Sequence, residues 1–428
     1  MTTPWKTYQV DGEVGRFEFS THQVLHDGKT RYDTAQAVFP RRRCWEWYKT
    51  RGFKEIAYIY GATEESYRKT SRLLNRIRYQ MEDGTPSRTV REQAEGEGER
   101  LMQAIDRKAE QILQVHGLTP DGLFEGEGKM DQGQEPVTLP ETQVTAALAR
   151  CQERVPVACD LSQNPVPYEA PAGTVNITID DVQVKRQKAE RTAHSQESKP
   201  TTPPEKRTRK AVHTTVVHLE HDKQSYVLAG HGIAHVLRLV LALLLNSGLV
   251  GSRFQFFTDG YTLLHDAIRR CFSWYGNLAI MLDWYHLKEK CKRQLSLAMK
   301  GRALRNEALT ELLPLLWYGL VDQAIDVINA LATSSIKNPE ALTTLIRYVE
   351  RNRAHIPCYA VRKELGLRNS SQIGEKMNDL VVSERQKHHG MSWSVSGSVA
   401  LASLTVLARN HEYAQWFDEG DIAFTLAA

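Results

Sequence analysis

Apolar and polar residues alternate over residues 175–185, and this pattern predicts a strand with one buried face. Asp180 and Asp181 stand at its centre. Because neighbouring side chains of a strand point to opposite faces, the two carboxylates cannot share a face. The apolar residues before the pair share a face of the strand with Asp181, whereas those after the pair share a face with Asp180. The pattern therefore leaves open which aspartate faces a site.

The chain after this strand predicts a mixed α/β sheet. Residues 214–220 and 225–229 form two further strands of a meander, and helices and strands then alternate: helix 233–246, strand 252–259, helix 261–272 and strand 278–286. Residues 287–368 are helical in pattern and too long for a simple crossover, so we expect an all-helical insertion. One helix over 371–389 and a last helix to about 409 complete this domain.

The part before residue 174 predicts a small β-element and then helices. Short alternating runs separated by Asp-Gly pairs indicate the β-element within residues 1–38. Residues 54–78 resemble a helix-turn-helix, in which Gly61 permits the turn and Thr63 caps the second helix. The expected apolar positions are Ile56, Ala57 and Tyr60 in the first helix and Leu73, Leu74 and Ile77 in the second.

Residues 88–115 predict a polar helix with a thin stripe at Leu101, Ile105, Ile112 and Leu113. The stripe suits a short dimerising coiled coil or a solvated helix, and the sequence does not choose between them. Residues 117–173 are rich in Gly, Pro, Glu and Gln, so we expect a connector that holds one helix at about 141–152.

Composition excludes several classes of protein. The 428 residues are 41% hydrophobic, which supports two or three domains with real cores. The start does not resemble a signal peptide, and the most apolar run, 236–245, is shorter than the ~20 residues that cross a bilayer. Six scattered cysteines fit a reducing compartment. We therefore expect a cytoplasmic protein with no membrane partner.

Two further site types are not expected. The pairs His231 with His235 and His218 with His221 have no neighbouring pattern that completes a zinc site. The chain also carries no phosphate-binding loop of the nucleotide-hydrolase kind, so no nucleotide cofactor is expected.

The net charge is only +4, but basic residues gather in three stretches. Arginines beside aromatic residues at 41–49 suit a phosphate-facing surface, or equally an amphipathic helix with Trp45 and Tyr48 in the core. The second helix of the helix-turn-helix and the loop at 185–210 are also basic, and such stretches favour double-stranded DNA. The expected DNA-binding residues are Arg41, Arg42, Arg43, Arg68, Lys69, Arg72, Arg76, Lys185, Arg186, Lys206, Arg207, Arg209 and Lys210, with Arg78 as a further cation.

Acidic residues recur where strands end or helices begin, at Asp180 or Asp181, Asp259, Asp283 and Glu375. Sites in open α/β sheets gather at strand ends. Two aspartates and a glutamate there can hold two Mg²⁺ ions, with Mn²⁺ expected to substitute, and two such ions promote phosphodiester chemistry. Ordinary alternatives exist for each acid: a strand-exit turn for Asp259, a helix cap for Asp283 with His286, and a solvated helix position for Glu375.

Four motifs together resemble the Mutator-like bacterial insertion-sequence transposases of the DDE superfamily. They are Asp180-Asp-Val-Gln-Val-Lys185, Phe257-Thr-Asp259-Gly260, Asp283-Trp-Tyr-His286, and Glu375-Lys-Met-Asn378 with Arg385, Lys387 and Gly390-Met-Ser-Trp393. The resemblance covers about residues 174–408. It implies an RNase H-like mixed-sheet catalytic domain with an all-helical insertion, preceded by a mainly helical DNA-binding region.

The resemblance also implies site roles. Asp180, Asp259 and Glu375 are the catalytic acids that bind two Mg²⁺ ions, and Asp181 stands where the family usually has glycine. Asp283 is an auxiliary acid, and His286 meets a phosphate or the scissile oxygen. The implied activity is cleavage of the element's ends and their transfer to target DNA by a homodimer or higher oligomer associated with the nucleoid.

We expect six segments: 1–38, 39–116, 117–173, a catalytic core at 174–286, the insertion at 287–368, and the end of the core at 369–428. Two other functions remain open at this point. One is a regulator derived from a transposase that binds DNA without cleaving it, and the other is a structure-specific nuclease with the same fold.

Overall fold

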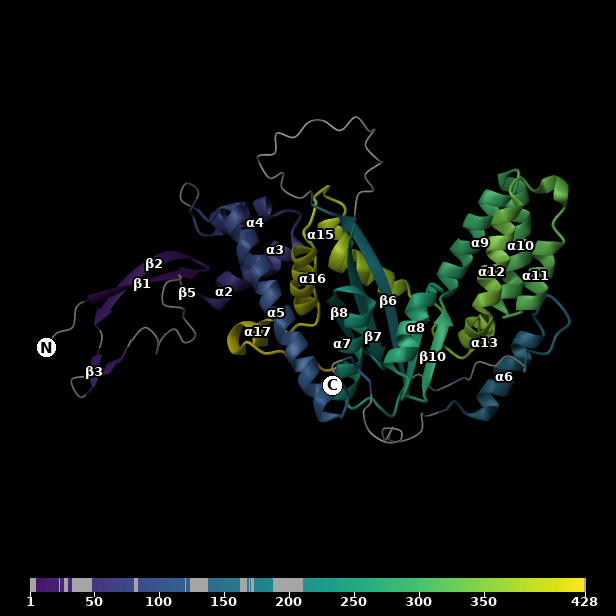
Figure 1. Ribbon diagram of the computed structural model, residues 1–428, viewed down its shortest axis with the longest axis horizontal. Coiled ribbons are helices and arrows are strands. Elements are labelled where there is room, and N and C mark those ends of the chain that lie inside the picture. Colours follow the sequence, from purple (N-terminus) through teal and green to yellow (C-terminus); the bar gives the residue numbers. More distant parts are fainter. Residues whose placement is uncertain are drawn as a thin grey trace, which may run out of the picture. The chain divides into compact units, whose positions relative to one another are not determined.

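The computed structural model describes residues 5–22, 24–26, 30–32, 48–80, 84–119, 121–123, 138–161, 168, 170, 173–187 and 211–426. It is a mixed α/β protein with one five-stranded sheet and many helices (Figure 1). The chain forms two compact units. Unit 1 comprises residues 1–105, 183–214 and 380–423, and unit 2 comprises residues 106–182, 215–379 and 424–428.

The five-stranded sheet confirms the predicted mixed sheet. Its strands are β6 (Thr174–Lys185), β7 (Ala211–His221), β8 (Gln224–Gly230), β9 (Arg253–Thr258) and β10 (Leu278–Leu282), in the order β10-β9-β6-β7-β8. β10, β9 and β6 run parallel, while β7 and β8 form an antiparallel hairpin. The last strand is shorter than predicted, because Asp283 already caps the next helix.

Helices α7 (Gly232–Asn246) and α8 (Thr262–Cys271) pack together, and α7 also packs on β8. Every residue from 236 to 245 is buried apart from Arg238, as expected for a core helix. The helix predicted in the connector is α6 (Glu141–Gln152), which packs on α13 (Tyr359–Glu364) through Ala147 and Cys151.

A block of helices follows β10. It contains α9 (Trp284–Ala298), α10 (Arg302–Trp317), α11 (Val321–Asn329), α12 (Pro339–Arg351) and α13 (Tyr359–Glu364), with 3-10 turns at Thr333–Ser335 and Arg353–His355. We call residues 284–364 the helical block. Apolar residues at helical spacing, such as Leu287, Leu295, Leu312, Leu316 and Leu345, form its shared core. Figure 1 shows α9 to α12 side by side.

The helix predicted over 371–389 is present as one uninterrupted run from Gln372 to Gln386, with a π-helical turn in its middle. α14 (Gln372–Asn378) is followed by a π-helix (Asp379–Ser383) and α15 (Glu384–Gln386). The predicted last helix is α16 (Val395–Arg409), and α17 (Tyr413–Glu419) lies beyond it. None of the helices in the described residues has the length and apolar character that crossing a membrane requires.

Unit 1 starts with the predicted β-element. β1 (Trp5–Gly12) and β2 (Gly15–His22) form an antiparallel hairpin, β3 (Val24–His26) pairs with β4 (Thr30–Tyr32), and the short β5 (Tyr48–Lys49) runs beside β1. The helices that follow are α2 (Arg51–Lys54), a π-helix (Glu55–Ile59), α3 (Tyr60–Thr63), α4 (Tyr67–Ile77) and the long α5 (Ser87–Val115).

The helix-turn-helix prediction is wrong in its details. Gly61 lies buried inside α3 instead of at the turn, and the cap of α4 is Ser66, whose hydroxyl accepts a hydrogen bond from the Lys69 N–H at 3.2 Å. Ile77, expected in the core, is 44% exposed. The prediction placed the start of the second helix three residues too early, because Thr63 and Ser66 are both suitable N-cap residues and the sequence does not distinguish them.

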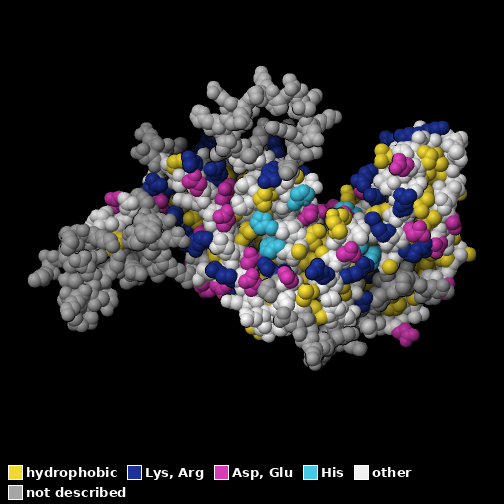
Figure 2. Space-filling view, viewed as in Figure 1, with side chains coloured by type: hydrophobic (Ala, Val, Ile, Leu, Met, Phe, Trp, Pro, Cys, Tyr) yellow, Lys and Arg dark blue, Asp and Glu magenta, His cyan; other side chains and the backbone are white. Residues whose placement is uncertain are grey.

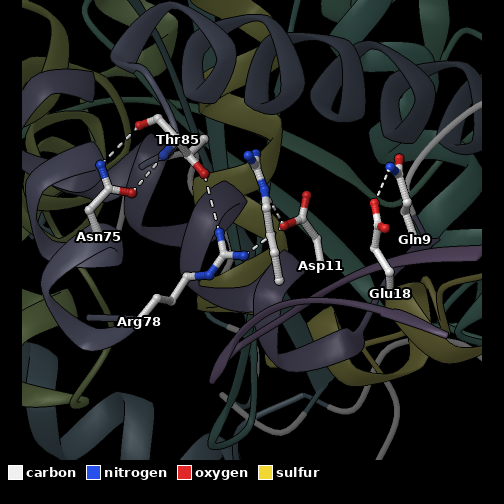
Figure 3. Close-up of polar contacts among 7 residues, drawn as sticks. Gln9, Asp11, Glu18, Asn75, Arg78 and Thr85 are labelled. Atoms are coloured by element: carbon white, nitrogen blue, oxygen red, sulfur yellow. Dashed lines mark hydrogen bonds and ion pairs between the residues drawn. The ribbon is translucent and has the colours of Figure 1, made fainter. Parts of the chain in front are cut away.

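Arg78 was expected among the DNA-facing cations, but its side chain is fully buried. One guanidinium nitrogen lies 2.6 Å from Asp11 Oδ1, and another donates to Thr85 Oγ1 at 3.2 Å. Figure 3 shows this network, in which Asn75 also contacts Thr85, with the nearby pair Gln9 and Glu18. A buried, paired guanidinium ties α4 to β1 and is not available to DNA.

The stripe on α5 is buried at Leu101 and Leu113 and partly exposed at Ile105 and Ile112. In unit 1, Val90, Ala94 and Leu101 are fully buried, and a Cβ on Gly98 would stand 2.2 Å from the backbone oxygen of Ala400 in α16. α5 therefore packs closely on α16 and uses its apolar face there. A fully solvated helix therefore does not describe α5, and the dimerising coil stays a prediction.

The buried His218 of β7 makes the stability of unit 2 sensitive to acid. Burial, with a smaller effect of Arg368, lowers the pKa of His218 from 6.5 to about 4. Between these values the unfolded chain binds a proton that the folded chain rejects, so the free energy of unfolding falls as the pH falls from 6.5 to 4, by about 1.4 kcal/mol per pH unit. Urea unfolding at several pH values should show a shallower dependence for His218→Gln. Identical dependences would contradict this assignment.

Candidate active site

Three aspartates lie at the same level of three neighbouring parallel strands. Asp259 and Asp283 directly follow β9 and β10, and Asp180 lies in the middle of β6, just beyond its last residue paired with β9. Thr178 of β6 pairs with Phe257 of β9, and two further residues along each strand bring Asp180 level with Asp259. Thr258 pairs with Leu282 of β10, so Asp283 is level with Asp259 as well. Strand register alone therefore gathers carboxylates from three distant segments of the sequence at one edge.

A pocket opens at this edge within unit 2. Asp180, Asp259, Glu375 and His286 line it together. Its other lining residues are Thr178, Ile179, Phe257, Thr258, Ser371, Gly374 and Asn378. The structure thus brings together the three acids and the histidine that the sequence singled out, while Asp181 and Asp283 do not line the pocket.

Asp180 is held by two hydrogen bonds. Its Oδ1 accepts from the Asp181 N–H at 2.8 Å, and its Oδ2 accepts from Asn378 Nδ2 at 2.7 Å. Its pKa is raised, mainly because surrounding protein hinders hydration of the carboxylate and in part because Asp259 and Asp181 are near. Asn378 is a site residue that the sequence reasoning left without a role. It stands three residues after Glu375, and this spacing on a helix could have indicated it.

Asp181 points to the other face of the sheet. Its Oδ1 accepts a short hydrogen bond from the Thr215 hydroxyl of β7. The alternation of side chains along β6 therefore resolves what the sequence pattern left open, since Asp180 faces the pocket and Asp181 links two strands.

Asp259 sits in a tight turn after β9. Its Oδ1 accepts from the Tyr261 N–H at 2.9 Å, and its backbone oxygen accepts from the Tyr348 hydroxyl of α12 at 2.8 Å. The next residue, Gly260, has a φ of +82°, and a Cβ there would stand 2.9 Å from the side chain of Asn352. Only glycine suits both the conformation and the close approach. Asp259 therefore both stabilises the turn after β9 and lines the pocket.

Glu375 lies on α14, which approaches β6 closely. A Cβ on Gly374 would stand 2.3 Å from the Thr178 hydroxyl, so glycine at this position lets the helix rest on the strand. Glu375 Oε1 lies 3.4 Å from His286 Nε2. Burial raises the pKa of Glu375, His286 lowers it, and Asp283 and Asp180 raise it further. Glu375 is therefore half-buried and not a fully solvated helix residue.

Asp283 is the N-cap of α9 and is completely buried. Its Oδ1 accepts from the His286 N–H at 2.9 Å, and its Oδ2 accepts a short hydrogen bond from the Ser371 N–H. Both carboxylate oxygens are thus occupied by backbone donors. Asp283 sets the start of α9, and through it the place of His286 in the pocket.

The donor set suits hard divalent cations. Three carboxylates share the pocket, and their mutual repulsion, which contributes to the raised pKa of Asp180 and of Glu375, is the kind that a cation relieves. As these side chains stand, no three His, Cys, Asp or Glu residues in the described part of the chain lie close enough to ligate one ion. Glu375 is turned toward His286 and Asp180 toward Asn378.

The predicted DNA-binding residues fall into three groups. Arg68, Arg72 and Arg76 are exposed on α4, and Lys185 and Arg186 are exposed at the end of β6. Lys69 is already paired with Glu64 at 2.9 Å and Glu65 at 3.4 Å. The remaining positions, Arg41, Arg42, Arg43, Lys206, Arg207, Arg209 and Lys210, lie outside the described residues.

No protein-family model and no curated protein sequence matches this chain. Two solved structures show weak similarity. The Drosophila P element transposase strand transfer complex is 10% identical, with 91% of this chain and 88% of that chain covered and a TM-score of 0.26. The Mos1 transposase paired-end complex with left transposon end is 11% identical, with 79% and 98% covered and a TM-score of 0.19. Similarities with such low TM-scores support no conclusion about the function of this chain.

Proposed function

We propose that this protein is a DDE transposase of a bacterial insertion sequence, with an RNase H-like catalytic domain into which the helical block is inserted. Asp180, Asp259 and Glu375 would bind two Mg²⁺ ions. The observation that supports this proposal is that three carboxylates from segments far apart in the sequence line one pocket at the ends of parallel strands. Bound there, the ions would activate a water or a 3′-hydroxyl and stabilise the leaving oxygen of a phosphodiester.

Residues in and beside the pocket orient this set. Asn378 donates to Asp180 and fixes its rotamer, and Asp283 fixes the first turn of α9. His286 stands beside Glu375, where its ring can bind a phosphate oxygen of the strand to be cut. Asp181, bonded to Thr215, keeps β6 and β7 in register and takes no part in the chemistry.

Metal binding can be tested without activity. A ligand that binds only the folded state at 100 times its Kd raises the free energy of unfolding by about 2.7 kcal/mol. We expect Mg²⁺ or Mn²⁺ to raise the Tm of the protein, and we expect the rise to vanish in Asp180→Asn and in Glu375→Gln. The exposed Asp266→Asn is the matched control and should keep the full rise. An equal rise in all four proteins would place the ions elsewhere.

The reaction can be tested on a plasmid that carries the gene with its flanking DNA. A transposase should give Mg²⁺-dependent strand breaks at the element's two ends and none on a plasmid without the flanks. Cleavage of both plasmids alike would indicate a nuclease. Binding without any cleavage would indicate a regulator, and either result would reject the proposal.

A further inference from the structure

Two basic side chains of the helical block lie over the ring of Tyr348, and a third, Arg293, lies near one of them. Lys290 Nζ of α9 lies 4.9 Å from the ring centroid, and the guanidinium of Arg351 on α12 lies 6.0 Å from it. Arg293 is close enough to affect the protonation of Lys290: burial lowers the pKa of Lys290, and Arg293 and Arg351 lower it further. Asp259 has a smaller, opposite effect on the pKa of Lys290. We call Lys290, Arg293 and Arg351 the basic row.

The basic row adjoins the candidate active site. The Tyr348 hydroxyl donates to the backbone oxygen of Asp259, and Arg351 Nη2 donates to that of Gly260 at 3.2 Å. His286, Lys290 and Arg293 are spaced by four and three residues, so they share one face of α9. Lys290 and Arg293 lie about 6 and 10 Å along the helix from His286, the span of two or three nucleotides of a B-form strand.

Within the described residues, the cations of the basic row form no ion pairs. No carboxylate of these residues lies within 4.0 Å of the charged nitrogens of Lys290, Arg293 or Arg351. Other cations of the helical block are paired, Lys292 of α9 with Glu289 at 3.2 Å and Arg353, in the turn after α12, with Asp322 at 2.7 Å. Three cations crowded together without a close counterion are unfavourable unless an anion joins them.

We propose that the basic row binds the phosphodiester backbone of the DNA strand beside the phosphate that enters the pocket. Each cation would neutralise one phosphate, and the shared face of α9 would align the strand with His286. Figure 2 shows Lys and Arg side chains gathered over α9 and neighbouring helices of the helical block. This inference depends on the proposed function, and it assigns the helical block a direct part in holding the substrate.

The salt dependence of DNA binding tests the basic row in the full-length protein. Each phosphate contact contributes roughly 0.9 to the slope of log K against log salt for duplex DNA. We expect the slope for a fluorescent duplex, measured by anisotropy in Ca²⁺, to fall by roughly 1.8 in the double variant Lys290→Ala and Arg293→Ala. Exchanging the two residues, Lys290→Arg with Arg293→Lys, keeps both charges and should restore the slope.

The matched control removes the same two residue types from the same block. Lys288 is exposed on α9, about 200° around the helix from His286, and Arg302 is exposed at the start of α10. The variant Lys288→Ala with Arg302→Ala should change the slope by less than a quarter as much. Equal slopes in the two double variants would overturn the inference. If the first double variant unfolds early, the single change at the exposed Arg293→Ala should still lower the slope by roughly 0.9.

The two proposals fail in different ways. If the wild-type protein cleaves flanked DNA with Mg²⁺ but the two double variants bind alike, the basic row is wrong and the transposase stands. If the slope falls as expected but no cleavage occurs, the transposase is wrong and the basic row is a DNA contact of another kind of protein.

Discussion

Replacing Asp259 with Asn should abolish Mg²⁺-dependent strand cleavage while leaving DNA binding intact. Loss of one metal ligand removes several kcal/mol of transition-state stabilisation, which corresponds to a rate at least about a thousandfold lower. The fold should persist, because an Asn side-chain oxygen can still accept from the Tyr261 N–H. Cleavage of flanked plasmid and binding of a labelled duplex are the two measurements.

The control for this variant is Asp266→Asn on α8. Asp266 is exposed and only 3.7 Å from Arg269, so its loss removes a similar charge without touching the pocket. It should cleave like the wild type. Full cleavage by Asp259→Asn would refute its role as a metal ligand, and loss of cleavage in both variants would point to a general effect of charge.

Replacing Asp283 with Ala should cost roughly 2–5 kcal/mol of stability. Loss of a helix cap costs about 1–2 kcal/mol, and leaving the buried Ser371 N–H without an acceptor costs about 1–3 kcal/mol more. Urea or thermal unfolding measures the change. Asp283→Asn should lose less, because its one amide oxygen can satisfy one of the two backbone donors.

The same two variants show whether Asp283 supports helix α9 or binds the metal ion. Asp283→Asn should keep the Mg²⁺-induced rise in Tm, since Asp283 is completely buried and does not line the pocket. If Asp283→Ala unfolds like the wild type, the carboxylate does not support α9. If Asp283→Asn loses the metal effect, the auxiliary acid is a ligand after all.

The strands of the sheet could be predicted from the sequence because residues 175–185 alternate apolar and polar residues and the other strands are short apolar runs bounded by turn residues. The predicted strand at 175–185 is β6, and the hairpin of β7 and β8 turns at the expected place. Level acids at strand ends follow from the same patterns once the strands are known to be parallel. That Asp180, Asp259 and Glu375 bind metal stays a prediction.

Other features depend on contacts between distant segments. The burial of Arg78 needs Asp11, which lies 67 residues earlier, and no local pattern reports it. The choice of Asp180 over Asp181 needs α14 on one face of β6 and Thr215 on the other. The predicted helix at 371–389 runs from Gln372 to Gln386, but its π-helical turn at Asp379–Ser383 has no signal in the local sequence.

The bond from Tyr348 to the carbonyl of Asp259 has a consequence for protein engineering. Deleting residues between β10 and α14 to obtain a minimal nuclease would remove the hydroxyl and the guanidinium that hold the backbone of this turn. The sheet could still fold after such a truncation, but the turn after β9 would lose the hydrogen bonds from Tyr348 and Arg351. A shortened chain would therefore need another hydrogen-bond donor to the Asp259 carbonyl to hold Asp259 in place.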